Sequence, residues 1–319
     1  MKGDRMGKSN RVPVESLAGY SRSSVPLAGS PAPAAARPAV RHQGYILAWH
    51  VVNVLLILSL LASIFCVGWE FSIRQYLRGF SDAIIPALGT PEEKVEAILA
   101  WMSNGPARLP AGPAVASSDR DPTATLNYQS LLSVCGTSVN AFINLADSGG
   151  LSARRLLLLD QDHRTKHVVA EVLIDGRWIV VDPTFRGIPR GPDGQLLTRQ
   201  DLANPAVLAA ATKSFHRYDS AYTYDRTAHV RLSRFRFVGR ALRVVLNAFI
   251  PGWENTKTAS LLVERQSYAA AALSILLLVF LLIGRAVFRW FGEARLGIHP
   301  SHFRDQFRRA MRAFRESAG

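Results

Sequence analysis

Two long apolar segments stand out in the pattern of hydrophobic and polar positions, one toward each end of the chain. The first runs from Tyr45 to Trp69 without a formal charge, and a helix of this length rises about 37 Å, enough to cross the hydrocarbon core of a bilayer. The second runs from Tyr268 to Gly284, and we expect its helix to continue to Phe288 with Arg285 extending toward the interface. We therefore predict transmembrane helices over residues 45–69 and 268–288. The alternative for each is a buried helix of a globular protein.

Between these segments, the pattern changes to shorter elements of both helical and strand type. Thr90-Pro91-Glu92-Glu93 combines a capping threonine, a proline at the first helical position and a capping-box glutamate, so it predicts a helix through Trp101. A second helix is predicted to begin at Cys135 and to end at Gly149-Gly150. The apolar positions of that second helix keep helical spacing: Val139, Phe142, Ile143 and Ala146.

A β-hairpin is predicted after this second helix. Two strands rich in Val and Ile flank Asp175-Gly176, a dipeptide suited to a two-residue type I′ turn. With Ile174 opposite Arg177, the register continues to Asp182 and puts it on the same sheet face as His167, as a diagonal neighbour. A three-residue loop would instead put the two side chains on opposite faces.

Composition adds a strong positive charge, and its distribution decides how to interpret it. The chain has 319 residues, 48% of them hydrophobic, with a formal net charge of +14. That apolar content excludes an intrinsically disordered chain. Most of the excess charge lies in residues 1–44 and 285–319, outside the two apolar segments, so nucleic-acid binding is a poor interpretation of it.

The basic ends instead favour an orientation in the membrane. Lys and Arg accumulate on the cytoplasmic side of spans, so we expect both termini to be cytoplasmic and residues 70–267 to be extracytoplasmic. The N-terminal tail, rich in Ser, Ala and Pro, is predicted to be disordered. Residues 230–250 are basic and amphipathic, and they suit either a membrane surface or packing on the central domain. The segment after Pro300 predicts an amphipathic helix that lies on a membrane, is solvated, or binds a partner.

Cys135, His167 and Asp182 are the candidate catalytic residues. A cysteine at a helix N-terminus feels the positive end of the helix dipole, which lowers the pKa of its thiol. The predicted hairpin puts a histidine beside an aspartate. Together they supply the nucleophile, the general base and the orienting acid that acyl transfer needs. His163 lies in a polar loop before the strand, so we expect it to be exposed and not to act as the base.

These segments resemble the core of the transglutaminase-like superfamily. The resemblance covers about residues 90–190 and rests on three parts: the helix that begins at Cys135 with the following Gly150-Leu-Ser-Ala153-Arg154 turn, a strand opening at His167, and Asp182-Pro183 ending the next strand. It implies a papain-like α+β fold and the Cys-His-Asp triad. It does not define the reaction, because the superfamily includes transamidating enzymes, cysteine proteases, amidases and inactive scaffolds.

Two positions near the nucleophile limit what the resemblance implies. Gly136 stands where the cross-linking enzymes carry an aromatic residue, so their glutamine specificity is not carried over. The backbone N–H of Cys135 is a natural oxyanion donor. Gln129, six residues before the cysteine, matches the papain-type spacing for a side-chain donor, with Asn127, Tyr128 or a purely structural role as alternatives.

The sequence therefore predicts a papain-like or transglutaminase-like catalytic core between two transmembrane helices at the cell membrane. The function hypothesis is a thiol-dependent acyl-transfer enzyme, a cysteine protease, amidase or transglutaminase-like enzyme that acts on a peptide, protein or cell-envelope substrate. The alternative is a non-catalytic scaffold in a membrane or envelope/exopolysaccharide export complex. Membrane lipids are expected partners, and no cofactor, metal or nucleic acid is expected.

The predicted domain organisation is a tail (1–44), a span (45–69), a transglutaminase-like domain (70–229), a basic connector (230–267), a span (268–288) and a basic cytoplasmic tail (289–319).

Overall fold

The computed structural model describes residues 37–105, 120–230, 243–244, 246–248, 250–296, 312 and 316. Most of the predicted N-terminal tail, most of the basic amphipathic stretch and nearly all of the segment after Pro300 lie outside the described residues. By its internal contacts the chain divides into residues 1–45 and 46–319, and the description below concerns the second unit.

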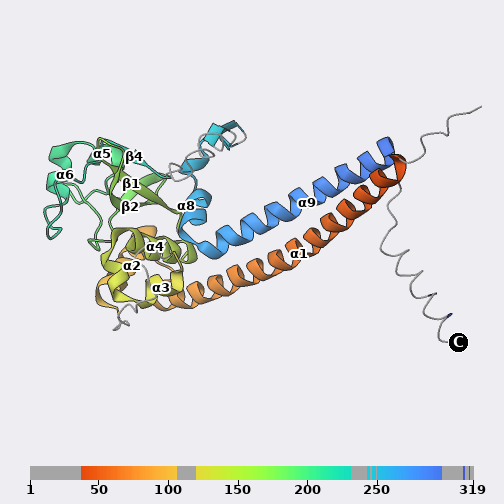
Figure 1. The fold of residues 1–319 in the computed structure, drawn as a ribbon. Coiled ribbons are helices and arrows are strands. Elements are labelled where there is room, and N and C mark those ends of the chain that lie inside the picture. The colour runs from red at the N-terminus through yellow and green to blue at the C-terminus, as the bar shows by residue number, and fades with distance from the viewer. Residues whose placement is uncertain are drawn as a thin grey trace, which may run out of the picture. The chain divides into compact units, whose positions relative to one another are not determined.

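The centre of the chain contains helices and strands, and the described part begins and ends with a long helix (Figure 1). In chain order they are α1 (Arg37–Ile84), α2 (Pro91–Asn104), α3 (Pro122–Asn127), the short 3₁₀ helix η1 (Gln129–Ser133), α4 (Cys135–Ser148), β1 (Ala153–Leu159), β2 (Thr165–Ile174), β3 (Arg177–Val181), α5 (Arg199–Leu202), α6 (Pro205–Ala211), β4 (Thr227–Ala228), the 3₁₀ helix η3 (Trp253–Asn255), α8 (Lys257–Glu264) and α9 (Gln266–Leu296).

Both predicted helix starts in the central region are confirmed. Thr90 caps α2, where it accepts a hydrogen bond from the Glu93 backbone while the Glu93 side chain accepts one from the Thr90 backbone at 2.7 Å. The second predicted helix is α4, which begins at Cys135 and is capped at its C-terminal end by Gly149. Short-range capping chemistry therefore fixes where α2 begins, whereas α4 begins after Val134 without a side-chain cap.

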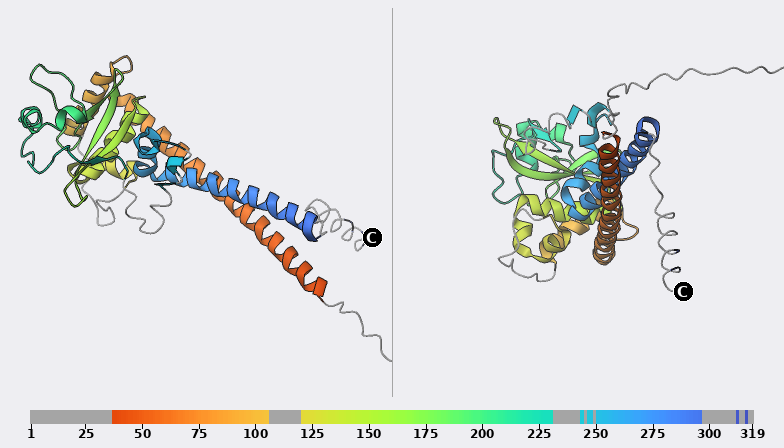
Figure 2. Two further views of the ribbon diagram at one scale, coloured as in Figure 1. Left: turned by 90° about the horizontal axis from the view of Figure 1, so that it is seen from above. Right: turned by 45° about the vertical axis from the view of Figure 1, so that its right-hand side comes forward.

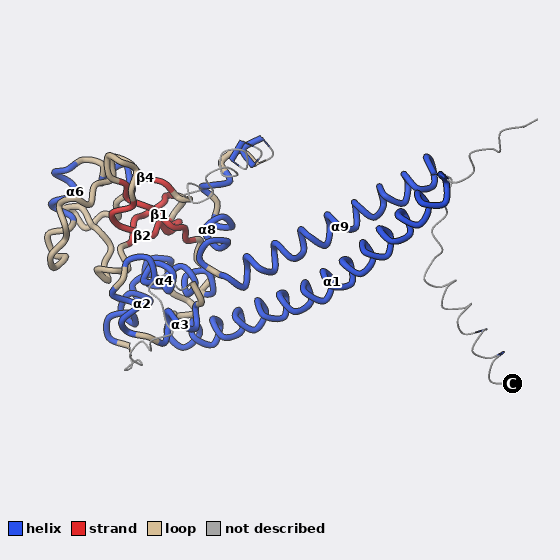
Figure 3. Tube along the Cα trace, in the orientation of Figure 1, coloured by secondary structure: helices blue, strands red, loops and turns tan. Residues whose placement is uncertain are grey.

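The four strands form one antiparallel sheet in the order β3-β2-β1-β4 (Figure 3). The predicted hairpin register is confirmed, because Ile174 pairs with Arg177 and the ladder continues to Ala170 opposite Val181. The ladder stops there. Asp182 instead pairs with Gly187 in an isolated bridge, because the chain turns back after the strand.

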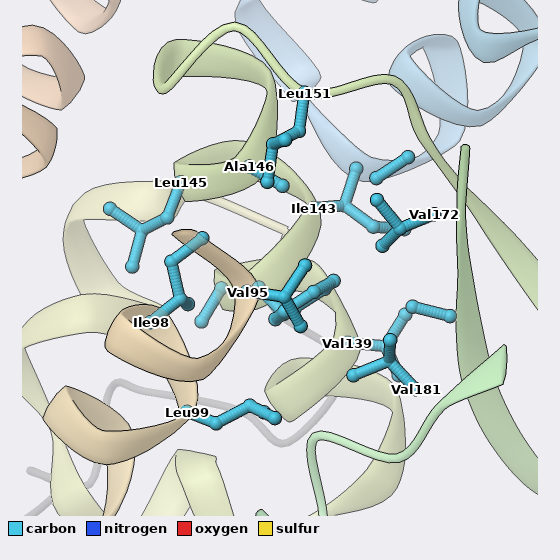
Figure 4. Close-up of a cluster of buried hydrophobic side chains, with 14 of the residues drawn as sticks. Val95, Ile98, Leu99, Val139, Ile143, Leu145, Ala146, Leu151, Val172 and Val181 are labelled. Atoms are coloured by element: carbon cyan, nitrogen blue, oxygen red, sulfur yellow. The ribbon is translucent and has the colours of Figure 1, made fainter. Parts of the chain in front are cut away.

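Helices cover one face of the sheet, and an irregular segment with α5 and α6 covers the other. Between α2, α4 and the first face lies the main hydrophobic core (Figure 4). The second core joins Val169 and Val180 of the sheet to Leu202 and Tyr224. Figure 4 labels part of the main core: Val95, Ile98, Leu99, Val139, Ile143, Leu145, Ala146, Leu151, Val172 and Val181.

In the described part of the chain, two helices are long and apolar enough to span a membrane, at residues 44–84 and 266–295. They flank the central domain and run side by side (Figure 2). Near one end the rings of Trp49 and Phe288 stack at 6.4 Å, and near the other Ser267 donates to Glu70 at 2.7 Å.

Both long helices extend past the predicted spans. In α1 the helix passes Trp69 without a break and its last turns pack into the domain core through Ile73 and Leu77. Contrary to our expectation, the Arg285 side chain does not extend toward the interface but contacts α1. It donates to Asn53 of α1 at 2.8 Å and lies over the Trp49 ring, because the neighbouring helix offers it an amide oxygen and an aromatic face.

Candidate active site

Cys135 is the first residue of α4, and side chains in the first turn of this helix hold the segment before it in place. Thr137 and Ser138 of the first turn donate through their hydroxyls to the carbonyls of Leu131 and Leu132 in η1. These bonds hold the chain that leads into the nucleophile position. The thiol is half-buried and is not part of a disulfide.

His167 and Asp182 form a buried pair beside this cysteine. The Nε2 atom of His167 lies 2.8 Å from Oδ2 of Asp182, and both side chains are almost fully buried. The other carboxylate oxygen accepts hydrogen bonds from the backbones of Thr184 and Phe185, at 3.0 and 3.3 Å. Because the chain turns back at Asp182, these backbone N–H groups can orient the carboxylate. Since Nε2 of His167 is bound to Asp182, the other ring nitrogen, Nδ1, remains for Cys135.

The two titrating groups shift each other's pKa in opposite directions. Burial lowers the pKa of His167, but its hydrogen bond to Asp182 and its contact with Cys135 outweigh this and raise the pKa to about 9. Burial raises the pKa of the Cys135 thiol, but the hydrogen bond and positive charge of His167, with the backbones of Val168 and Gly136, lower it overall. Both directions favour a thiolate beside an imidazolium.

An aromatic cluster surrounds the histidine ring. Tyr222 stacks on it with ring centroids 4.3 Å apart, and Phe185 and Tyr218 meet it edge-on at 5.8 and 6.4 Å. Phe215 stacks in turn on Phe185 at 5.7 Å. Apolar rings on several sides restrict water around the His167–Asp182 hydrogen bond and strengthen it.

Arg186 connects the segment after Asp182 to the segment before Cys135. Its guanidinium donates to the carbonyl of Thr184 at 2.7 Å, to that of Pro183, and to that of Leu132 at 2.7 Å. The residue holds a left-handed backbone with φ of 57°, which costs energy for a side chain other than glycine. One side chain thus joins the loop that follows Asp182 to the segment that leads into Cys135.

The remaining candidate residues are exposed or half-buried. Gln129 is exposed at the start of η1, and its role as an oxyanion donor stays a prediction. Asn127 is likewise exposed and Tyr128 is half-buried. His163 is exposed in the loop between β1 and β2, as predicted.

The position after the nucleophile faces basic side chains. A Cβ added at Gly136 would meet the Arg120 guanidinium at 3.1 Å and that of Arg155 at 3.7 Å. Glycine therefore leaves room for two arginines at the position where the cross-linking enzymes carry an aromatic residue. Within the described ranges, no group of three or more His, Cys, Asp or Glu side chains is placed to hold a metal.

Sequence reasoning missed the aromatic cluster and Arg186. The only signal was the density of aromatic residues in the segment from Phe215 to Tyr224, which carries no helical or strand periodicity. The fold brings this segment back over His167 through the second core, and such a long-range return has no local sequence signature.

A mixed helix-and-sheet domain in which a helix-starting cysteine meets a strand histidine and an aspartate has the α+β, papain-like organisation. Residues 78–183, about a third of the chain, match the family model of the transglutaminase-like superfamily. The matched residues include Cys135, His167 and Asp182, so this part of the chain is similar to a transglutaminase-like domain. Searches of curated proteins and of solved structures give no match.

Proposed function

We propose that this chain is a membrane-anchored, thiol-dependent acyl-transfer enzyme that acts on a peptide, protein or cell-envelope substrate. Cys135 is the nucleophile, His167 the general base and acid, and Asp182 the residue that orients the imidazole. The observation that carries the proposal is the buried His167–Asp182 pair, at 2.8 Å, beside a half-buried cysteine at a helix start whose pKa the histidine lowers.

The proposed reaction begins with attack of the Cys135 thiolate on a substrate carbonyl. The oxyanion that forms receives hydrogen bonds from the Cys135 backbone N–H. His167, protonated, gives its proton to the leaving amine, and a thioester remains on Cys135. A second nucleophile, water or an amine, then loses its proton to His167 and attacks the thioester, which restores the thiolate. Water gives hydrolysis and an amine gives transamidation.

Thiol labelling of membranes tests the nucleophile. With a chloroacetamide or iodoacetamide probe at neutral pH, we expect Cys135 to label faster than an ordinary thiol, because its pKa is lowered. Cys135→Ser should abolish the fast labelling, and His167→Ala should slow it. Cys66→Ser is the matched control, since it removes the other cysteine and should leave the fast labelling intact.

The result also separates enzyme from scaffold. If Cys135 labels no faster than an ordinary thiol and His167→Ala changes nothing, the enzyme proposal fails. A transglutaminase-like scaffold in a membrane complex would then be the better account of the fold.

We further propose that α1 and α9 span the membrane, with the catalytic domain extracytoplasmic and both termini cytoplasmic. Exposed apolar side chains along both helices and the basic tails support this. Reporter fusions near Ser117 and after Gly319 should give signals from opposite sides of the membrane. A cytoplasmic signal at Ser117 would overturn the orientation.

A further inference from the structure

A polar cavity of about 170 Å³ lies where α1, the end of α4 and the break between α8 and α9 meet. It is smaller than the roughly 300–1,000 Å³ pockets that take drug-sized ligands, so it suits a small polar group. Its lining residues are Arg74, Leu77, Arg78, Asp147, Ser148 and Arg265.

The position of the cavity along α1 relates it to the membrane surface. Phe71 is the last large exposed apolar side chain of α1, and Arg74 and Arg78 follow it by three and seven residues. At a rise of 1.5 Å per residue, they lie about 5 and 11 Å farther along the helix. The headgroup layer on each side of a bilayer is about 5–8 Å thick. The backbone of Arg74 therefore lies within this layer, and that of Arg78 lies just outside it, from where a long side chain can extend back to lipid phosphates.

The charges around the cavity leave a positive excess. Three of the lining residues are arginines and one is an acid, Asp147, and both Asp147 and Glu70 of α1 are neutralised. Asp147 pairs with Lys257 at 2.7 Å and with Arg265 at 2.8 Å, and Glu70 pairs with Arg74 at 2.7 Å and with Arg265 at 3.2 Å. Burial raises the pKa of Asp147, but Lys257 and Arg265 lower it overall, so it remains an anion held by cations.

Arg78 is a positive charge that takes no part in these ion pairs. Its side chain is exposed, and over the described part of the chain it makes no ion pair. On the proposed extracytoplasmic side, the position of Arg78 is also unusual, since lysine and arginine are depleted on the translocated side of a span. A local role at that side would account for two arginines there.

We propose that this cavity binds the phosphate of an anionic phospholipid headgroup, with Arg74 and Arg78 as the binding residues. Arginine matches phosphate through its forked donors. The inference rests on the proposed membrane-spanning placement of α1 and α9, and not on catalysis. Bound there, the lipid would contact the C-terminal end of α4, the helix whose first residue is Cys135.

Lipid retention by the full-length protein tests the proposal. The protein in detergent is mixed with phosphatidylglycerol or phosphatidylcholine, and retained lipid is counted by native mass spectrometry. We expect phosphatidylglycerol, but not phosphatidylcholine, to be retained. The loss of one charged hydrogen-bond donor in Arg78→Gln should weaken retention about tenfold.

Two matched variants control for charge. Arg164→Gln and Arg177→Gln each remove one exposed arginine outside the cavity and should retain lipid like the wild type. Arg74→Gln/Arg78→Gln should reduce retention further. Because Arg74 also pairs with Glu70, the single Arg78 variant carries the test if the double variant unfolds.

A second arm separates a lipid headgroup from free phosphate. If inorganic phosphate at millimolar concentration raises the Tm of the lipid-free protein as much as phosphatidylglycerol does, and Arg78→Gln removes both effects, the site takes phosphate and the lipid assignment is overturned. Equal retention of phosphatidylglycerol by wild type and Arg78→Gln would overturn the site itself. Neither result depends on Cys135 reactivity, so a failure here is distinct from a failure of the proposed enzyme.

Discussion

At the residue scale, the proposed site depends on side chains that hold other side chains in place. Asp182 has both oxygens occupied, one by His167 and the other by backbone N–H groups. Tyr222 covers a face of the imidazole at 4.3 Å. These contacts leave the ring little freedom to turn, so its second nitrogen stays directed at Cys135.

Arg186 gives the first prediction at this scale. Arg186→Ala should lower the free energy of unfolding by about 1–3 kcal/mol, because carbonyls of Pro183, Thr184 and Leu132 lose a charged donor. It should also slow Cys135 labelling, since the segment that leads into Cys135 is no longer joined to the loop that follows Asp182. Denaturant unfolding in detergent and labelling rates measure both effects.

Arg190 is the matched control for that prediction. It lies four residues farther on and forms ion pairs with Glu92, partly buried, and Glu96, exposed, at 2.6 and 2.7 Å. Arg190→Ala should cost less than about 1 kcal/mol and leave labelling unchanged. Equal labelling rates in Arg186→Ala and Arg190→Ala would contradict a positioning role for Arg186.

At the scale of elements, the β2–β3 hairpin determines which side chains meet. Asp175 and Gly176 both have positive φ, 48° and 76°, as a type I′ turn requires. This two-residue turn puts His167 and Asp182 on one face of the sheet. The register is therefore a condition for the proposed triad.

Gly176 gives a prediction for this element. Gly176→Val should destabilise the domain by about 1–2 kcal/mol, because a β-branched residue is strained at φ of 76°. A Cβ there meets no neighbour within 4 Å, so the register and the rate of Cys135 labelling should be kept. Asp175→Asn is the control and should be nearly neutral, since asparagine tolerates the left-handed region. A loss of stability as large as that of Gly176→Val would contradict the strain argument.

Local signals in the sequence predicted these elements well. The capping box at Thr90 and the Asp175-Gly176 turn act within a few residues, so their chemistry is visible in the sequence. The return of Tyr222 to His167 and the bridge from Arg186 to Leu132 span tens of residues without regular structure. Such contacts depend on packing of the whole domain, and no periodicity encodes them.

At the scale of the whole molecule, two adjacent residues join the domain to the long helices. Glu264 ends α8 and binds Arg155 and, at 3.1 Å, Asn140 of α4. Arg265, almost fully buried, binds Asn144 of α4 at 2.7 Å and Glu70 of α1 at 3.2 Å. The sequence predicted none of these four contacts, because each pairs residues more than a hundred positions apart.

Glu264 tests this junction. Glu264→Ala should lower the free energy of unfolding by about 3–5 kcal/mol, because it leaves the buried Arg155 without its carboxylate. Thermal and denaturant unfolding of the full chain in detergent measure the loss. Glu293→Ala is the control, since its pair with Arg289 is exposed and should contribute less than about 1 kcal/mol. Similar losses in the two variants would contradict a structural role for the junction.

The central claim is that His167 and Asp182 make Cys135 a thiolate nucleophile, and the pH dependence of Cys135 alkylation in the Cys66→Ser protein tests it most directly. The pKa of Cys135 is lowered from its ordinary value and that of His167 is raised to about 9. The thiolate–imidazolium pair is therefore the main form at pH values between these two pKa values. Alkylation should therefore already be fast at neutral pH. His167→Ala should move the inflection of the rate to higher pH and slow alkylation at neutral pH about tenfold or more, because less of the thiol is then ionised. An inflection at the ordinary thiol value in the unaltered site, unmoved by His167→Ala, would contradict the account.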